Sequence, residues 1–400
     1  MVDLSIEIAG LKLRNPLVAA SGSITHTLLR IKKAEEANCG AVITKAIVLQ
    51  PGDNTKRPSR RRLFLQEGID LIESAKKETK IPIIANVFGA GRNSDGWVRI
   101  AQECEKAGAD ALELNFSCPN VGILQKKLEE IKEGESGALG ALLGQSPQLA
   151  GEATKAVCSR VKIPVFCKMT PEAPDIAAVA KACVNAGAAG ITAVNALSRF
   201  GGVDIYNGGR TKTLDLDKNQ NTFVCNPDDP LLGPAFKDRA LRDVAVIART
   251  LPPHIPILGG GGLYSFEDAV EMIMCGAHVA TFCSAVMRKG WEIFAKMETE
   301  IKQYMEKMGY EKVSDFKGAG LQYIVPQGKA RWIENRPVIN LDRCNGCGIC
   351  TKMGHCEAYT LKAKKADVDL SKCVGCIYCQ FICPRKAITM KETGHYTYEE

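Results

Sequence analysis

The sequence predicts an α/β protein: a (β/α)8 TIM barrel with an N-terminal β-hairpin, followed by a small cysteine-rich α+β domain. Three observations lead to this prediction. Eight short apolar segments recur between residues 17 and 284, helical patterns separate them, and the last sixty residues hold eight cysteines in two tight runs. Alternation of strand and helix repeated eight times is typical of a barrel. A doubly wound sheet is the alternative, but the even spacing and the absence of an early G-x-G-x-x-G segment argue against it.

The hairpin is predicted by residues 4–16, LSIEIAGLKLRNP, because apolar and polar residues alternate on both sides of a glycine. Three of the predicted helices end in similar phrases, EEANCGAVI, EKAGADALE and VNAGAAGIT, in which a glycine ends the helix before a buried strand. The eight predicted strands are LVAAS (17–21), AVITK (41–45), IIANVF (83–88), ALELNF (111–116), VFCKM (165–169), GITAVN (190–195), ILGGGG (257–262) and VATFCS (279–284).

The ends of these strands carry polar residues and glycines, where the chemistry of a TIM barrel is found. They are Ser21, Lys45, Asn86, Asn115, Lys168, Asn195, the glycines at 259–262 and Ser284. Buried lysines and amides are costly without partners, so this set indicates a binding site rather than core filling. The glycine-rich end of the seventh strand and the end of the eighth suit a phosphate bound by backbone N–H groups. We therefore predict FMN across the barrel mouth.

Two long insertions interrupt the pattern, at 119–147 and 198–234. Loops of this length are usually lids, binding elements or interfaces. We predict an FMN-binding barrel over residues 1–300, a helical linker over 301–337 and an iron–sulfur domain over 338–400.

The two cysteine runs at the C-terminus predict that domain. The second run, ending in Cys383 and Pro384, has the spacing C-x2-C-x2-C-x3-C-P of bacterial ferredoxins, which hold two [4Fe–4S] clusters. A structural zinc pair or a disulfide scaffold is the alternative, but three cysteines at this spacing, twice, suit cubane clusters better. Since the fourth cysteine of each run binds the other cluster, the predicted ligand sets are Cys344, Cys347, Cys350 and Cys383 for one cluster, and Cys373, Cys376, Cys379 and Cys356 for the other.

Cys356 departs from the pattern, because five residues separate it from Cys350 where three are usual. His355 is the alternative ligand at this place. The domain is thus expected to be ferredoxin-like and to move electrons singly.

Composition narrows the class of protein. The formal net charge of +7 over 400 residues is modest, and the densest basic stretch, residues 56–62, has no interleaved aromatic residues, so nucleic-acid binding is not expected. No run of eighteen apolar residues and no signal peptide are evident, so we expect no membrane span and a cytoplasmic location. Nine of the 17 cysteines are scattered singly, which suits a reducing compartment.

Several motifs resemble the dihydroorotate dehydrogenase superfamily. They are NP (15–16), AASG (19–22), TK (44–45), ALELNFSCPN (111–120), CKMTP (167–171), TAVN (192–195), GGGGL (259–263) and FCSA (282–285). The added cysteine module is similar to the C-terminal half of dihydropyrimidine dehydrogenase, in which a ferredoxin-like domain follows a flavin barrel. The resemblance implies FMN, two [4Fe–4S] clusters, and an oxidoreductase acting on CH–CH bonds. It also implies an oligomeric assembly whose partner is an FAD- and NAD(P)H-dependent electron-transfer subunit, or else a ferredoxin.

The resemblance implies roles for individual residues. Cys118 would be the general acid/base, exchanging a proton with one carbon while flavin N5 exchanges hydride with its neighbour. Lys168 would place positive charge near the flavin N1–C2 carbonyl. The other implied cofactor contacts are Ala20, Ser21, Lys45, Asn115, Asn195, Gly261, Gly262, Cys283 and Ser284. The implied substrate contacts are Asn115, Asn120, Asn195 and Ala196.

Departures from the family pattern leave the substrate open between several cyclic or conjugated carbonyl compounds. The loop after the second strand, PSRRRLFLQEGID (58–70), lacks the asparagine of enzymes that act on dihydroorotate, and Ala196 stands where relatives have a serine or threonine. Asn120, in contrast, is shared with the enzymes that act on dihydroorotate and favours that substrate. The alternatives are a dihydropyrimidine dehydrogenase subunit, a dihydroorotate dehydrogenase, another ring or enoyl reductase, and an electron-transfer subunit with FMN only as a relay.

Overall fold

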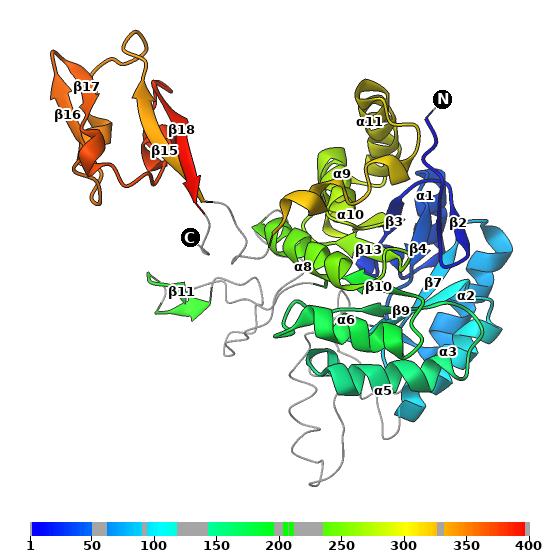
Figure 1. The fold of residues 1–400 in the computed structure, drawn as a ribbon. Coiled ribbons are helices and arrows are strands. Elements are labelled where there is room, and N and C mark those ends of the chain that lie inside the picture. Colours follow the sequence, from blue (N-terminus) through cyan, green and yellow to red (C-terminus); the bar gives the residue numbers. More distant parts are fainter. Residues whose placement is uncertain are drawn as a thin grey trace. The chain divides into compact units, whose positions relative to one another are not determined.

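The computed structural model describes residues 2–49, 62–89, 94–117, 143–195, 203–206, 208–211, 235–325 and 332–396. The chain divides into two compact units, Met1–Leu321 and Gln322–Glu400. The colours of Figure 1 follow the sequence from the first unit to the second.

The first unit is a closed parallel barrel, as predicted. Its eight strands are β3 (Leu17–Ala19), β4 (Ala41–Ile43), β7 (Ile83–Val87), β8 (Ala111–Asn115), β9 (Val165–Lys168), β10 (Gly190–Ala193), β13 (Ile257–Gly260) and β14 (Val279–Phe282). Their order is β4-β3-β14-β13-β10-β9-β8-β7, and β7 pairs again with β4 to close the ring. Two short parallel strands that the sequence did not predict, β5 (Ile47–Val48) and β6 (Leu63–Phe64), extend the sheet from β7.

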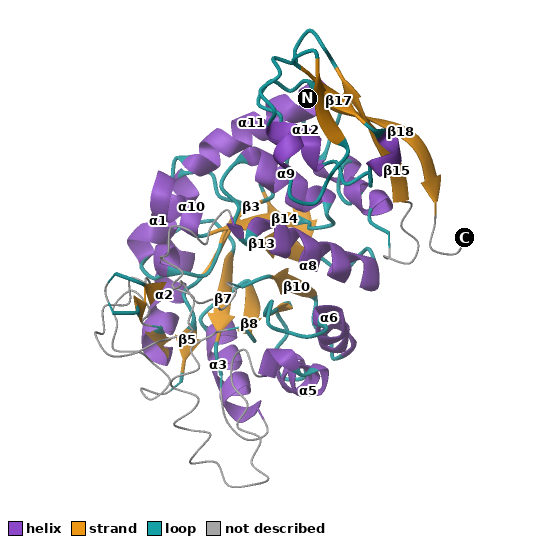
Figure 2. Cartoon of the chain, turned by 90° about the vertical axis from the view of Figure 1, so that its left-hand side faces the viewer, coloured by secondary structure: helices purple, strands orange, loops and turns teal. Residues whose placement is uncertain are grey.

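Helices surround these strands (Figure 2). They are α1 (Leu28–Glu36), α2 (Leu65–Glu78), α3 (Asp95–Lys106), α5 (Pro147–Cys158), α6 (Ile176–Asn185), α8 (Lys237–Thr250), α9 (Phe266–Met274), α10 (Ser284–Lys289) and α11 (Ile293–Met308). Apolar residues of α11 recur every three to four positions, including Met297, Ile301 and Met305, and are buried in the core of the first unit. No helix in the described part of the chain is long and apolar enough to cross a membrane.

The predicted N-terminal hairpin is present, with β1 (Ile6–Ile8) and β2 (Leu11–Leu13) joined by a two-residue turn. Ala9 and Gly10 both have positive φ, as this kind of turn requires. Ile8, Leu11 and Leu13 pack with inward residues from the first halves of the barrel strands. The hairpin therefore closes the N-terminal end of the barrel, which leaves the C-terminal end for chemistry.

The glycine-terminated helices behave as predicted in two of three cases. Gly108 and Gly187, each one residue beyond the C-caps of α3 and α6, have φ values of +93° and +105°. After α1 the left-handed residue is Asn38, with φ +66°, and not Gly40. Gly40 is needed for another reason: a Cβ atom there would lie 2.2 Å from the carbonyl oxygen of Asn15.

The second unit consists of two small antiparallel sheets and short helical segments. One sheet pairs β15 (Trp332–Ile339) with β18 (Ile388–Tyr396), and the other pairs β16 (Tyr359–Lys362) with β17 (Lys365–Val368). A 3-10 segment at Ile349–Lys352 and the helix α12 (Tyr378–Ile382) lie in the two cysteine runs.

Candidate functional site

The inner face of the barrel changes from apolar to polar along the strands. Ile84, Ala111 and Phe166 belong to the apolar layer above the hairpin. Since side chains alternate between the faces of a strand, the residues two positions later also point inward. The polar residues at this level are Asn86, Glu113, Lys168, Thr192 and Thr281, and all five are buried.

A hydrogen-bonded network joins three of these residues. The Lys168 ammonium lies 3.5 Å from Glu113 Oε1, and Asn86 Nδ2 donates to the same oxygen at 2.5 Å. Asn115 Nδ2 in turn donates to Asn86 Oδ1 at 3.2 Å. Neighbouring parallel strands thus place an ion pair and two amides on one connected path.

Two buried polar atoms at this level are not satisfied. Glu113 Oε2 and Thr192 Oγ1 have no hydrogen-bond partner among the described residues. Buried polar atoms are hydrogen-bonded in the great majority of proteins, so orphaned ones point to a group that the site receives. A polar ring system with donors and acceptors on its edge, such as a flavin, fits this requirement.

The network continues to the barrel mouth through Ser117 and Asn195. Ser117 donates from its hydroxyl to Asn115 Oδ1 at 2.9 Å, and Asn195 Nδ2 donates to the carbonyl oxygen of Ser117 at 2.8 Å. The structure thereby brings together Asn115, Lys168 and Asn195, which were predicted from three different strands.

The residues predicted to hold a phosphate follow the ends of β13, β14 and β3. Gly261 and Gly262 have φ values of +130° and +73°, a backbone path that favours glycine. The N–H of Ala20 donates to the carbonyl oxygen of Phe282 at 2.8 Å, and a Cβ on Gly22 would lie 2.4 Å from Cys283 Sγ. The ends of β3 and β14 are therefore in contact. The remaining predicted residues here, Ser21 and Ser284, are half-buried.

Three predicted residues, Cys118, Asn120 and Ala196, lie outside the described residues. Lys45 is described: it is half-buried at the end of β4, and its N–H donates to the carbonyl oxygen of Thr25 at 3.2 Å.

Glu113, Ser117 and Thr192 were not predicted as site residues from the sequence. The available signal was a single glutamate within the apolar strand ALELN, at an inward position between Ala111 and Asn115.

The two cysteine runs of the second unit share one backbone conformation. Gly346 and Gly375, between the first and second cysteines, have φ values of +71° and +68°. The residues after the second cysteines, Gly348 and Ile377, are also left-handed, and each precedes the short helical segment that carries the third cysteine. Two loops with left-handed residues at matching positions and the same spacing of their first three cysteines suit two groups of the same kind.

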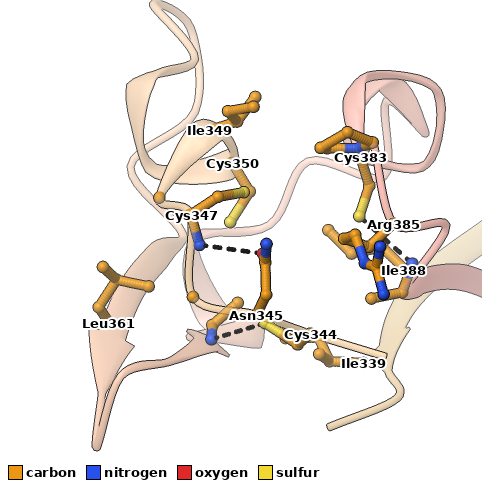
Figure 3. A pocket seen from close by; sticks show the side chains of 15 residues that line it. Ile339, Cys344, Asn345, Cys347, Ile349, Cys350, Leu361, Cys383, Arg385 and Ile388 are labelled. Carbon is orange, nitrogen blue, oxygen red and sulfur yellow. Dashed lines mark hydrogen bonds between the residues drawn. The ribbon is translucent and has the colours of Figure 1, made fainter. Parts of the chain in front are cut away.

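A pocket in the second unit is lined by four cysteines from both runs (Figure 3). The cysteines are Cys344, Cys347, Cys350 and Cys383. Backbone N–H groups of Ala366 and Ala387 donate to the sulfurs of Cys344 and Cys383 at 3.4 and 3.3 Å. The remaining wall is largely apolar, with Ile339, Ile349, Leu361 and Ile388.

Charge and burial act on these thiols in different directions. The N–H of Ala366 lowers the pKa of Cys344. Burial raises the pKa of Cys350, and the neighbouring Cys344, Cys347 and Cys383 raise it further. Four mutually repelling thiolates in one apolar pocket would need a cationic group between them, so the pocket fits an iron–sulfur cluster.

The other four predicted ligands are less completely assembled. Burial raises the pKa of Cys379, and the nearby Cys376 and Cys373 contribute. His355 Nε2 lies 3.1 Å from Cys376 Sγ. Cys356 is half-buried and packs against the hydrophobic core of the second unit. Across the described residues, no three His, Cys, Asp or Glu side chains converge as they would around a single metal ion. A cubane cluster spreads its four cysteine ligands around the cube, so it does not require such convergence.

Comparison with known proteins places the barrel in a family. Residues 3–305 match the dihydroorotate dehydrogenase family. Among curated proteins, the chain is 29% identical over 338 residues to the catalytic subunit of dihydroorotate dehydrogenase B (NAD(+)) of Thermoplasma volcanium, a match covering 80% of this chain and 100% of that protein. It is 29% identical over 319 residues to the protein of the same name from Methanocaldococcus jannaschii, covering 76% of this chain and 94% of that one.

A second kind of relative matches more of the chain. The NAD-dependent dihydropyrimidine dehydrogenase subunit PreA of Escherichia coli is 28% identical over 374 residues, covering 87% of this chain and 84% of that protein. The family match alone spans three quarters of the sequence and agrees with the barrel, its N-terminal hairpin and the polar residues at the strand ends. The chain belongs to the dihydroorotate dehydrogenase family of flavin oxidoreductases, which act on CH–CH bonds.

Proposed function

We propose that this protein is the catalytic subunit of a dihydropyrimidine dehydrogenase. It would reduce, or in reverse form, the C=C bond of a pyrimidine such as uracil or thymine, a bond conjugated to a carbonyl. FMN in the barrel and two [4Fe–4S] clusters in the second unit would be its cofactors.

The length of the match to PreA supports the dihydropyrimidine enzyme over the dihydroorotate enzyme. A match over 87% of 400 residues covers about 348 of them, more than the 321 residues of the first unit, so it must continue into the cysteine-rich unit. The match to the Thermoplasma protein covers 80% of the chain and the whole of that relative, which is no more than the length of the first unit. The cysteine-rich unit is therefore a feature that favours the dihydropyrimidine enzyme.

The barrel residues supply the binding and proton chemistry. Bound FMN would exchange hydride with the substrate. Lys168, Asn115 and Asn195 would hold the ring from the mouth, and the glycine backbone at 261–262 would hold the phosphate with Ser284. Cys118 would give or take the proton at one carbon of the substrate bond, while the neighbouring carbon exchanges hydride with the flavin, as the N-x-x-C-P motif implies.

The second unit would carry the electrons. Cys344, Cys347, Cys350 and Cys383 line one pocket and would hold one cluster. Cys373, Cys376, Cys379 and Cys356 would hold the other. Since the relatives are named as subunits, we propose a partner that carries FAD and the NAD(P)H site.

Dihydroorotate is the second candidate substrate. Two observations favour it. Several relatives are named as catalytic subunits of dihydroorotate dehydrogenase B, and Asn120 matches a substrate contact of dihydroorotate dehydrogenases.

An anaerobic reoxidation experiment distinguishes the candidates. The protein is purified without oxygen and reduced chemically, and flavin reoxidation is followed after addition of uracil, thymine, orotate or a set of enoyl compounds. Rapid reoxidation by uracil or thymine supports the proposal. Response to orotate alone identifies a dihydroorotate dehydrogenase. Response only to enoyl compounds would assign another reductase, and no response with intact flavin and cluster spectra would leave FMN as an electron relay.

A further inference from the structure

The carboxylate of Glu113 is buried beneath the barrel mouth and has no role in the chemistry above. We infer that Glu113 is a positioning residue for Lys168, and that its negative charge limits how strongly the site favours reduction of the flavin. The inference rests on the proposed FMN site.

The contacts of Glu113 fix its place. It is 0% exposed and Lys168 is 6% exposed, so neither charge is screened by bulk water. Glu113 Oε1 receives Asn86 Nδ2 at 2.5 Å and lies 3.5 Å from Lys168 Nζ. Asn86 is itself held by Asn115 Nδ2 at 3.2 Å. The carboxylate cannot turn away from the lysine without breaking this path.

The balance of charge gives the direction of the effect. Glu113 Oε2 has no partner among the described residues, so no further donor offsets its negative charge. Lys168 Nζ lies 3.5 Å from Glu113 Oε1, and a buried pair of opposite charges cancels much of the field that either would produce alone. With Glu113 neutral, Lys168 would act on the flavin with its full charge and would favour the anionic reduced ring more strongly.

The first experiment is a sulfite titration of the holoenzyme carrying Glu113→Gln. Sulfite adds to flavin N5 to give an anionic adduct, so its affinity reports positive charge at the ring, and the flavin absorbance follows it without substrate turnover. We expect E113Q to bind sulfite about tenfold more tightly, equivalent to about 30 mV for a two-electron couple.

Asp243→Asn is the matched control. Asp243 is also 0% exposed and also ion-paired, with Arg239 Nε at 2.7 Å and Arg242 Nη1 at 2.8 Å, but it lies on the outer helix α8. D243N removes another buried, ion-paired carboxylate, one outside the barrel interior, and is expected to leave sulfite affinity unchanged. A shift of equal size in D243N would mean that the effect of E113Q reflects lost stability, which would overturn the inference.

A double variant tests whether Glu113 acts through Lys168. In a Lys168→Gln background, E113Q should change sulfite affinity by less than about twofold, because a buried carboxylate left without its cation disfavours the charged form, so little negative charge remains for the substitution to remove. An undiminished tenfold effect there would overturn the positioning role. If E113Q does not fold, Glu113→Asp, which keeps the charge but withdraws it by one methylene, should shift the affinity in the same direction by about threefold.

The two proposals fail in different ways. Wild-type protein that binds no FMN would overturn the proposed function together with this inference. Wild-type protein with FMN, and an E113Q variant with FMN and unchanged sulfite affinity, would overturn only the inference.

Discussion

At the scale of single residues, the proton chemistry has few possible carriers. Lys168 is paired with Glu113, and the amides of Asn115 and Asn195 cannot take up a proton near neutral pH. The carbonyl oxygen of Ser117 is held by Asn195 Nδ2 at 2.8 Å, and the next residue in the sequence belongs to the N-x-x-C-P motif. That residue is Cys118, whose thiol can exchange a proton.

We therefore expect Cys118→Ser to slow flavin reduction by the dihydro-substrate by about 10² or more, because a serine hydroxyl is a far weaker acid. Stopped-flow absorbance under anaerobic conditions measures this rate. Cys275→Ser is the control, because Cys275 follows α9 on the outside of the barrel. An unchanged rate in the Cys118 variant would remove the acid/base role from this residue.

His278 predicts how the stability of the barrel depends on pH. Its Nδ1 accepts the N–H of Ile257 at 3.1 Å, and its Nε2 lies 3.0 Å from Lys317 Nζ. Burial, and then the charge of Lys317, lowers the pKa of His278 from 6.5 to about 4. The imidazole of His278 therefore binds a proton more readily in the unfolded chain than in the folded one. Its contribution to the stability of the fold is full above pH 6.5 and is lost as the pH drops toward 4.

Between about pH 7.5 and about pH 5, the expected loss in the free energy of unfolding is at most about 2 kcal/mol. Urea unfolding at about pH 7.5 and about pH 5 measures it. His278→Asn keeps an acceptor for the N–H of Ile257 but does not titrate, so its stability should change less over this interval. An equal change in both proteins would assign the pH dependence to other groups.

At the scale of elements, the helix ends can be tested with a matched pair of glycines. Gly108 has φ +93°, and the nearest atom to an added Cβ is Lys76 Cγ at 3.6 Å, so Gly108→Ala meets backbone strain but no clash. We expect it to destabilise the barrel by about 1–2 kcal/mol. Gly151 lies inside α5 with 3.6 Å to its nearest neighbour, and Gly151→Ala should stabilise by about 0.5–1 kcal/mol. Thermal unfolding of both variants tests this, and shifts of the same sign would contradict the role of Gly108.

The sequence predicted the eight barrel strands because each is a buried apolar run bounded by a helix end. It missed β5 and β6, which have two residues each and show no periodicity. It also placed the turn after α1 at Gly40, because glycine is the usual signal. Asn38 tolerates the left-handed conformation as well, and only the close approach of Asn15 shows what Gly40 is for.

The candidate site was predictable where residue types are costly in a core. Lysine and asparagine at strand ends predicted Lys168, Asn115 and Asn195, and hydrogen bonds connect these three residues in the structure. Glu113 was not assigned, because one acidic residue in a strand does not show which cation it meets. The cation is Lys168 on the neighbouring strand β9. It is not directly opposite Glu113 but two residues further along, because Glu113 pairs with Phe166 and Asn115 pairs with Lys168.

At the scale of the whole molecule, the proposed function joins a barrel for two-electron chemistry to a unit for one-electron transfer in one chain. The two functions can be separated, because the cysteines of the second unit are remote in sequence from the barrel residues. Cys347 and Cys376 are the exposed members of the two runs, so replacing them disturbs packing least.

We expect Cys347→Ser with Cys376→Ser to leave flavin reoxidation by substrate within about twofold of wild type, since the barrel is unchanged. Turnover driven by a one-electron donor should fall by about 10² or more, because clusters lacking a thiolate are lost or altered. Iron content and electron paramagnetic resonance check the clusters, and Cys275→Ser again serves as the control. Undiminished turnover in a variant without clusters would mean that electrons reach the barrel directly, and the second unit would then need another role.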